Sequence, residues 1–213
     1  MLPVQSFPWE LVLFAVFVVA LLFVVRRVRQ RRMALPAAAS VDLPHLTTNQ
    51  RLTATIRRVF RDNAQGVWLV IAEAGGTKLT FCAVDYEQSV ARYNESIGKP
   101  VTVALFALAT LAAGGIEAMR EQIADADRVD LRPDMVRLIP QGQYANDYVV
   151  IGRALDARED SWDEMPLTVY RTQVLQSEGL SLTLDLAAPR VDAAFSPASM
   201  VHGSARLFGC LAD

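Results

Sequence analysis

The feature that most constrains this chain is an uninterrupted apolar segment near its N-terminus, followed at once by a block of arginines. Residues 11–25 read LVLFAVFVVALLFVV, fifteen apolar residues without a break. At the rise of an α-helix this run is about 22 Å long, and its extension back to residue 7 brings it to roughly 28 Å, close to the thickness of a bilayer core. The sequence therefore predicts a single transmembrane helix over residues 7–28.

The charges around this segment predict its orientation. Trp9 lies where an aromatic anchor meets the membrane interface, and five arginines follow the apolar run: Arg26, Arg27, Arg29, Arg31 and Arg32. A cleaved signal peptide would carry positive charge before its apolar region, and residues 1–25 contain no Lys or Arg. A buried core helix is rarely apolar on every face. We therefore expect an uncleaved anchor in a bacterial-type inner membrane, with the tail 1–10 outside, the C-terminal part in the cytoplasm, and the arginines on anionic lipid headgroups.

The rest of the chain is mildly acidic and poor in metal ligands. The 213 residues carry a formal net charge of −2, and without the anchor and its arginines residues 33–213 carry −6. Nucleic acid is therefore an unfavoured partner, because binding phosphate requires a basic face. Cys82 and Cys210 form no CxxC pair, and His45 and His202 are the two histidines. The sequence thus predicts no metal site and no bound cofactor.

After an Ala/Pro-rich linker over residues 33–45, the pattern becomes that of short strands. Residues 52–60 alternate and then change phase at Arg57-Arg58, which indicates a bulge. Gly75-Gly76 predicts a tight hairpin between strands at 67–74 and 77–84. A helix is expected from Asp85, as its N-cap, to Gly98, with Val90, Tyr93 and Ile97 on its buried face.

A second group of elements follows the helix. Residues 101–106 begin an apolar run that Gly114-Gly115 ends, an amphipathic helix is expected from residue 116, and residues 135–140 form a short strand. We therefore expect a β-rich (α+β) soluble domain, whose part 46–140 resembles in strand order a five-stranded barrel of the oligonucleotide/oligosaccharide-binding (OB) type. Residues 141–213 are expected to add strands at 148–155, 167–175, 180–186 and 201–211, as a second subdomain or an extension of the same sheet.

Three groups of residues are candidates for a site. The acidic stretch between two expected strands carries Asp160, Asp163 and Glu164 beside Trp162, and is interpreted as a solvated loop or a partner-binding surface, because exposed aromatic residues favour interfaces. Arg57, Arg58 and Arg61 lie on the first strand, as a charged edge or as a phosphate contact beside Phe60. His202 and Ser204 share a strand face but lack a nucleophile elbow.

These observations favour a protein without catalytic machinery. The first hypothesis is a single-pass membrane protein whose cytosolic β-rich domain docks other proteins as a scaffold or assembly subunit. The alternative is a membrane-tethered, OB-like module that binds a ligand or nucleic acid through the arginines of its first strand. An enzyme with a site built from scattered residues is a third hypothesis, which a deep pocket with convergent titratable groups would support.

Overall fold

The computed structural model describes residues 46–115, 135–162, 164–177, 180–189 and 195–212, all within one unit, Asp42–Asp213. The predicted span 7–28 and linker 33–45, like the helix expected from residue 116, lie outside these residues. Within the described part, no helix is long and apolar enough to cross a membrane.

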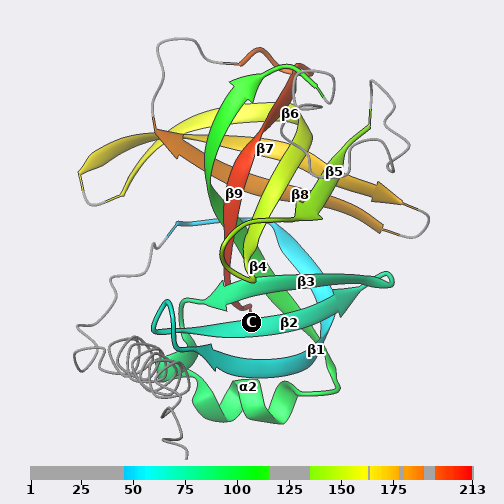
Figure 1. The fold of residues 1–213 in the computed structure, drawn as a ribbon, viewed down its shortest axis with the longest axis vertical. Coiled ribbons are helices and arrows are strands. Elements are labelled where there is room, and N and C mark those ends of the chain that lie inside the picture. The colour runs from blue at the N-terminus through cyan, green and yellow to red at the C-terminus, as the bar shows by residue number, and fades with distance from the viewer. Residues whose placement is uncertain (1–45, 116–134, 163, 178–179, 190–194, 213) are drawn as a thin grey trace, which may run out of the picture. The chain divides into compact units, whose positions relative to one another are not determined.

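The described residues form nine strands with one short α-helix between the third and fourth (Figure 1). The strands are β1 Arg51–Asp62, β2 Val67–Ala74, β3 Thr77–Ala83, β4 Pro100–Ala113, β5 Arg137–Pro140, β6 Asp147–Trp162, β7 Met165–Ser177, β8 Leu180–Pro189 and β9 Met200–Leu211. A 3₁₀ turn, η1 (Tyr86–Gln88), precedes the helix α2 (Val90–Ser96).

The hairpin predicted at Gly75-Gly76 is confirmed. Both glycines have positive φ, 51° and 77°, which suits a tight turn whose twist matches that of the strands. The strands on either side pair from Leu69 with Cys82 to Ala74 with Thr77. The bulge predicted in β1 is also present, because the register with β2 shifts between Ile56 and Arg58.

All nine strands belong to one sheet, and two additional pairings close it into two rings. The first ring runs β1-β2-β3-β9-β4 and closes through β1–β4 pairing. The second runs β9-β4-β8-β7-β6 and closes through β9–β6 pairing, with β5 added to β6. Strands β4 and β9 are common to both rings and pair along almost their whole length, as the two long strands that cross Figure 1 show.

The predicted fold class is therefore wrong in two respects. The described residues are dominated by β-strands rather than being α+β, and the predicted OB-like barrel over 46–140 does not form within those residues. Its expected fifth strand, β5, pairs with β6 in another part of the sheet, and β9 pairs with β3 and β4 instead. Local sequence patterns identified the strands, but this partner choice is a non-local pairing that periodicity does not encode.

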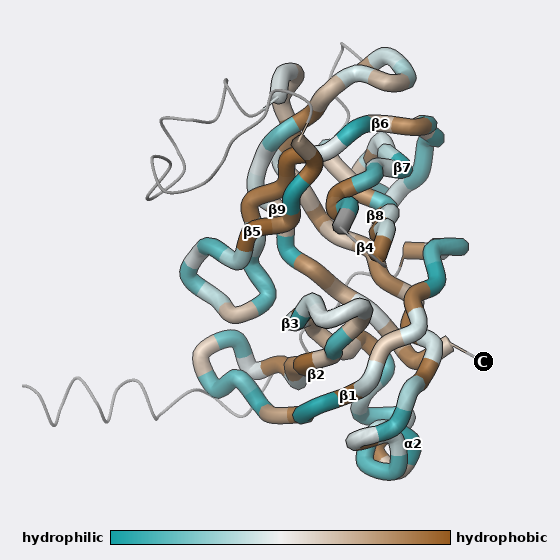
Figure 2. Tube along the Cα trace, turned by 90° about the vertical axis from the view of Figure 1, so that its right-hand side faces the viewer, coloured by the Kyte–Doolittle hydropathy of each residue, from teal (hydrophilic) through white to brown (hydrophobic). Residues whose placement is uncertain are grey.

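The two largest of the three apolar clusters lie on opposite faces of this sheet, because side chains alternate along each strand. The larger contains fully buried residues such as Ile56, Phe81 and Leu207, and the second contains Leu69, Phe106 and Phe208. Figure 2 shows the corresponding hydrophobic stretches on β2 and β9, whereas α2 is mainly hydrophilic. Burial of both faces explains why β2 reads as a nearly continuous apolar run.

The expected helix is present but packs differently from the prediction. Tyr93 is fully buried, whereas Val90 and Ile97 are 42% and 45% exposed. Asp85 makes no side-chain cap, and its carboxylate instead accepts a hydrogen bond from the Tyr93 hydroxyl at 2.5 Å. Burial and the neighbouring Asp85 both raise the pKa of Tyr93. The helix therefore contributes one buried aromatic residue rather than an apolar face.

Candidate functional site

Along its second half, strand β6 pairs with a single described strand, β7. Its first half pairs with β9 up to Arg153, and residues 153–162 pair with β7. Ala154 still exchanges backbone hydrogen bonds with Ala198 and Ser199. Within the described residues, no strand pairs with the opposite side of residues 155–162. We call this side the β6 edge; at about 3.3 Å per residue it is roughly 26 Å long.

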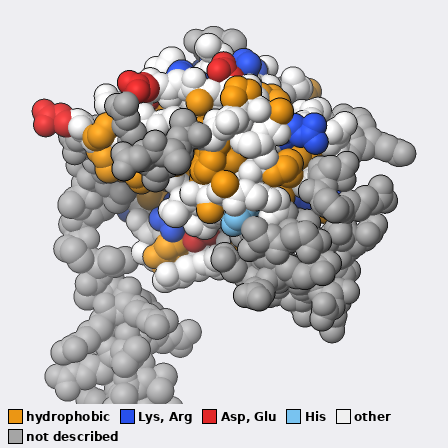
Figure 3. Space-filling model, turned by 90° about the horizontal axis from the view of Figure 1, so that it is seen from above, with side chains coloured by type: hydrophobic (Ala, Val, Ile, Leu, Met, Phe, Trp, Pro, Cys, Tyr) orange, Lys and Arg blue, Asp and Glu red, His pale blue; other side chains and the backbone are white. Residues whose placement is uncertain are grey.

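The β6 edge carries mainly polar side chains, and exposed apolar residues lie at its base and, on β7, beside its tip. Most side chains of residues 155–161 are exposed. Leu155 at the base is 41% exposed, and Met165, which pairs with Trp162 at the tip, is 43% exposed. β6 and β7 form the yellow hairpin that projects to the left in Figure 1. Seen from above, this end of the domain shows hydrophobic side chains interspersed with charged ones (Figure 3).

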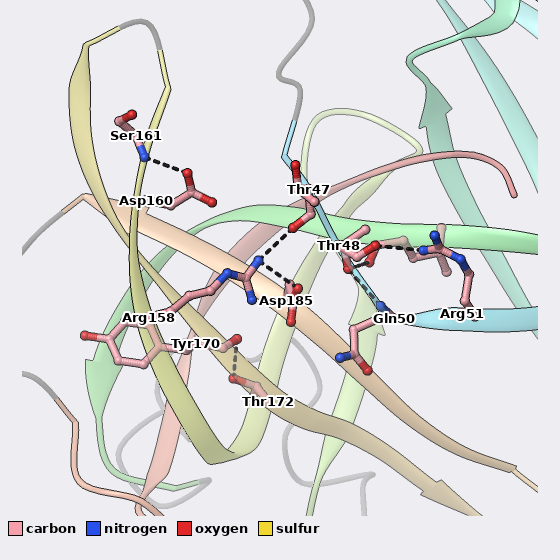
Figure 4. Close-up of polar contacts among 11 residues, drawn as sticks. Thr47, Thr48, Gln50, Arg51, Arg158, Asp160, Ser161, Tyr170, Thr172 and Asp185 are labelled. Carbon is pink, nitrogen blue, oxygen red and sulfur yellow. Dashed lines mark hydrogen bonds and ion pairs between the residues drawn. The ribbon is translucent and has the colours of Figure 1, made fainter.

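Arg158 attaches the β6 edge to the body of the domain (Figure 4). One guanidinium nitrogen, Nη2, donates to the backbone oxygen of Thr47 at 2.8 Å and to the Asp185 carboxylate on β8 at 3.1 Å. Thr47 is held in turn through its neighbour, because the Thr48 hydroxyl donates to the Leu105 carbonyl on β4. The hairpin, β8 and the segment entering the domain therefore meet at one side chain.

Asp185 is the buried partner in this arrangement. Its side chain is 1% exposed, whereas that of Arg158 is 44% exposed. One carboxylate oxygen, Oδ1, is buried and has no hydrogen-bond donor among the described residues. A buried carboxylate without its cation is costly, so Arg158 is required to keep Asp185 in this position. The guanidinium group of Arg158 is therefore bound to Asp185 and Thr47 within the domain. The acidic residues of β6 then determine the charge of the edge.

The candidate partner surface predicted from the sequence lies at the tip of this hairpin. Asp160 and Trp162 end β6, and Glu164 is exposed in the turn with φ 64°; Asp163 lies outside the described residues. Trp162 does not project as expected, because it packs against the second apolar cluster. The stretch interpreted as a solvated loop is instead strand as far as Trp162.

The three arginines of β1 do not form a common surface. Arg57 pairs with Glu73 at 3.1 Å, and the Arg58 guanidinium lies 5.3 Å from the centre of the Phe60 ring. Arg61 is the cross-strand neighbour of Trp68. Because successive side chains of a strand point to opposite faces, Arg58 and Arg61 lie on different faces. A single phosphate-binding patch from these residues is not assembled.

Replacing Arg57, Arg58 and Arg61 together with Gln is expected to change stability little, by about 0.5 kcal/mol or less per site, because exposed charges contribute little. Thermal melts of the full-length protein in mild detergent measure this effect. We also expect no change in retention of single-stranded nucleic acid. Salt-dependent binding by the native protein that the triple variant loses would contradict this expectation and favour the nucleic-acid alternative.

His202 and Cys82 are buried within the sheet, whereas Ser204 is exposed. His202 is 7% exposed, and its Nδ1 lies 3.1 Å from the carbonyl oxygen of Gly114. Burial raises the pKa of the Cys82 thiol to about 12, although nearby Arg206 opposes the shift. Cys82 is therefore protonated at neutral pH and unreactive as a nucleophile. The described residues contain no group of His, Cys, Asp and Glu that could hold a metal ion.

The sequence identified the acidic tip but not the edge itself. Arg158, Asp185, Leu155 and Met165 were not singled out, because residues 155–162 lack the apolar alternation that marks a half-buried strand. Trp9 and the five arginines after the apolar run lie outside the described residues, so their predicted membrane role stays a prediction. Comparison with protein-family models and with curated proteins finds no match for this chain.

Proposed function

We propose that this protein is a non-enzymatic docking or scaffold subunit that binds another protein along the β6 edge. The observation that supports this most directly is that no strand of the described residues pairs with the side of residues 155–162 opposite β7, with exposed Leu155 at the base of the edge and exposed Met165 of β7 beside its tip. Unpaired strand edges template the addition of another strand, and proteins normally cover or shorten them. A long edge that is fixed to the domain by Arg158 is thus suited to receive a partner.

The membrane setting is part of the same proposal. The apolar residues 11–25 and the five arginines after them support a location at a bacterial-type inner membrane, with the domain on the cytoplasmic side. Lipid would then hold the protein in place and the β6 edge would recruit a partner to that surface. A reporter active only outside the cytoplasm, fused after the last residue, is expected to stay silent.

Capture of partners by the full-length protein in mild detergent tests the docking function. The edge variant is Leu155→Lys with Met165→Lys. Its matched control is Val90→Lys with Ile97→Lys, which changes two similarly exposed apolar residues on and beside α2. We expect the native protein and the control to retain the same proteins and the edge variant to lose them. Equal retention by all three would contradict docking at this edge, and loss in the control alone would assign docking to α2.

A further inference from the structure

The charges along the β6 edge determine what kind of strand can pair with it. Residues 156–162 are in continuous register with β7, from Asp156 opposite Arg171 to Trp162 opposite Met165. Because side chains alternate between faces, Asp156, Arg158 and Asp160 share one face of the hairpin. Arg158 is committed to Asp185 and Thr47. On this face, the edge therefore presents two carboxylates, Asp156 and Asp160, four residues apart.

Neither carboxylate is strongly neutralised within the domain. Asp156 is 65% exposed and lies 3.7 Å from Arg171, a separation at which an exposed ion pair contributes little. Asp160 accepts a hydrogen bond from the adjacent Ser161 amide, which leaves its negative charge in place. Glu164 adds a further exposed carboxylate in the turn.

The same charges disfavour a second copy of this chain as the occupant. Two β6 edges paired antiparallel about Arg158 would place Asp156 of each copy opposite Asp160 of the other, and like charges directly opposite each other destabilise a strand pair. Pairing of the edge with itself in this register is therefore unfavourable.

We infer that the β6 edge binds an extended segment of another protein that carries basic residues at two positions four apart. The segment would add a strand on the side of β6 opposite β7, with main-chain hydrogen bonds along the edge and its two basic side chains beside Asp156 and Asp160. The position between them faces Arg158 and takes a neutral or acidic residue. This inference names the partner chemistry for the docking function proposed above and rests on it.

Defined peptides test the inference without knowledge of the natural partner. The first probe is a nine-residue Thr/Val peptide with Lys at positions 3 and 7. A second peptide moves the second Lys to position 6, which puts the two charges on opposite faces, and a third has Glu at positions 3 and 7. Affinity for the full-length protein in mild detergent is measured by fluorescence anisotropy at two salt concentrations. We expect the first peptide to bind at least tenfold more tightly than the other two, with affinity that falls as salt rises.

Charge-reversal variants locate the site. Asp156→Lys with Asp160→Lys is expected to weaken the first peptide at least tenfold and to strengthen the Glu peptide. The control, Glu87→Lys with Glu95→Lys, makes the same change in net charge at exposed positions of η1 and α2 and is expected to leave both affinities within twofold. Hydrogen exchange of the backbone amides in 155–161 should slow when the first peptide binds, because strand addition protects them.

The outcomes separate this inference from the docking function. Equal affinity for the three peptides, or equal weakening in both charge-reversal variants, would overturn the basic-segment inference. If the Leu155/Met165 variant still loses its captured proteins in that case, docking at the edge stands and its chemistry is different. Dimers that form through the edge, seen as concentration-dependent sedimentation that the Asp156/Asp160 variant alters, would instead identify a second copy as the occupant and overturn the inference.

Discussion

Replacing Gly203 with Ala is expected to lower the free energy of unfolding by roughly 4 kcal/mol, at the upper end of the range for single substitutions. Gly203 lies on β9 between Leu111 of β4 and Val150 of β6. A Cβ atom at this position would lie 1.8 Å from the backbone oxygen of Thr110 and 3.1 Å from Cα of Leu111. Relief requires a strand shared by both rings to move, because the obstructing atoms are backbone.

Urea unfolding of the full-length protein in mild detergent, followed by far-ultraviolet circular dichroism, measures this loss. Gly66→Ala is the matched control. Gly66 has φ +73° and no atom within 4 Å of an added Cβ, so its replacement costs about 1–2 kcal/mol from backbone conformation alone. Equal losses in the two variants would show that the close approach of β4 and β9 at Gly203 is not a constraint.

Replacing Trp68 with Ala is expected to cost about 3 kcal/mol. The side chain of Trp68 is partly buried against the larger apolar cluster, and its ring stacks on Tyr86 with 4.3 Å between ring centroids. Tyr86 in turn lies 5.3 Å from the ring of Tyr93, which is fully buried. The substitution therefore removes apolar contact area and the end of a chain of three aromatic rings that joins β2 to η1 and α2.

Thermal melts with Trp68→Phe beside Trp68→Ala isolate the aromatic contribution. Phe keeps a ring for stacking, so it should recover at least half of the lost stability, since an aromatic pair adds about 0.5–1.5 kcal/mol beyond its buried area. If the Ala variant loses less than about 1 kcal/mol of unfolding free energy, Trp68 does not contribute to stability as a core residue does. The Arg57/Arg58/Arg61 variant is the natural comparison, because Arg61 is the cross-strand neighbour of Trp68.

Much of the secondary structure of this domain could be predicted from the sequence. Strand β2 was expected at the residues where it lies, because Gly66 and Gly75-Gly76 mark both of its ends with positive φ. Strands β7, β8 and β9 also overlap their predicted ranges. Local turn chemistry and alternation were sufficient in each case, because both act over a few residues.

The arrangement of the strands could not be predicted in the same way. The assignment of β9 rather than β5 to the first ring depends on contacts between residues more than a hundred positions apart, such as Cys82 opposite Phe208. The second half of β6 was missed because its side chains are exposed on both faces and leave no apolar period. The candidate site shows the same division. Its acidic tip is visible in the composition, whereas the lack of a second described strand beside residues 155–162 depends on how the whole sheet is arranged.

The sharing of β9 by both rings has a consequence for synthesis of the protein. Strands β1–β4 emerge first, yet their ring is closed by a strand that begins about 90 residues after β4 ends. At the usual rates of translation these residues take several seconds to emerge, far longer than a strand needs to form a local hairpin. The β2–β3 hairpin can form on the ribosome, but β3 and β4 then await their common neighbour. Closure of the first ring should therefore be a late and slow step, and chaperones would protect the strand edges that the finished fold covers.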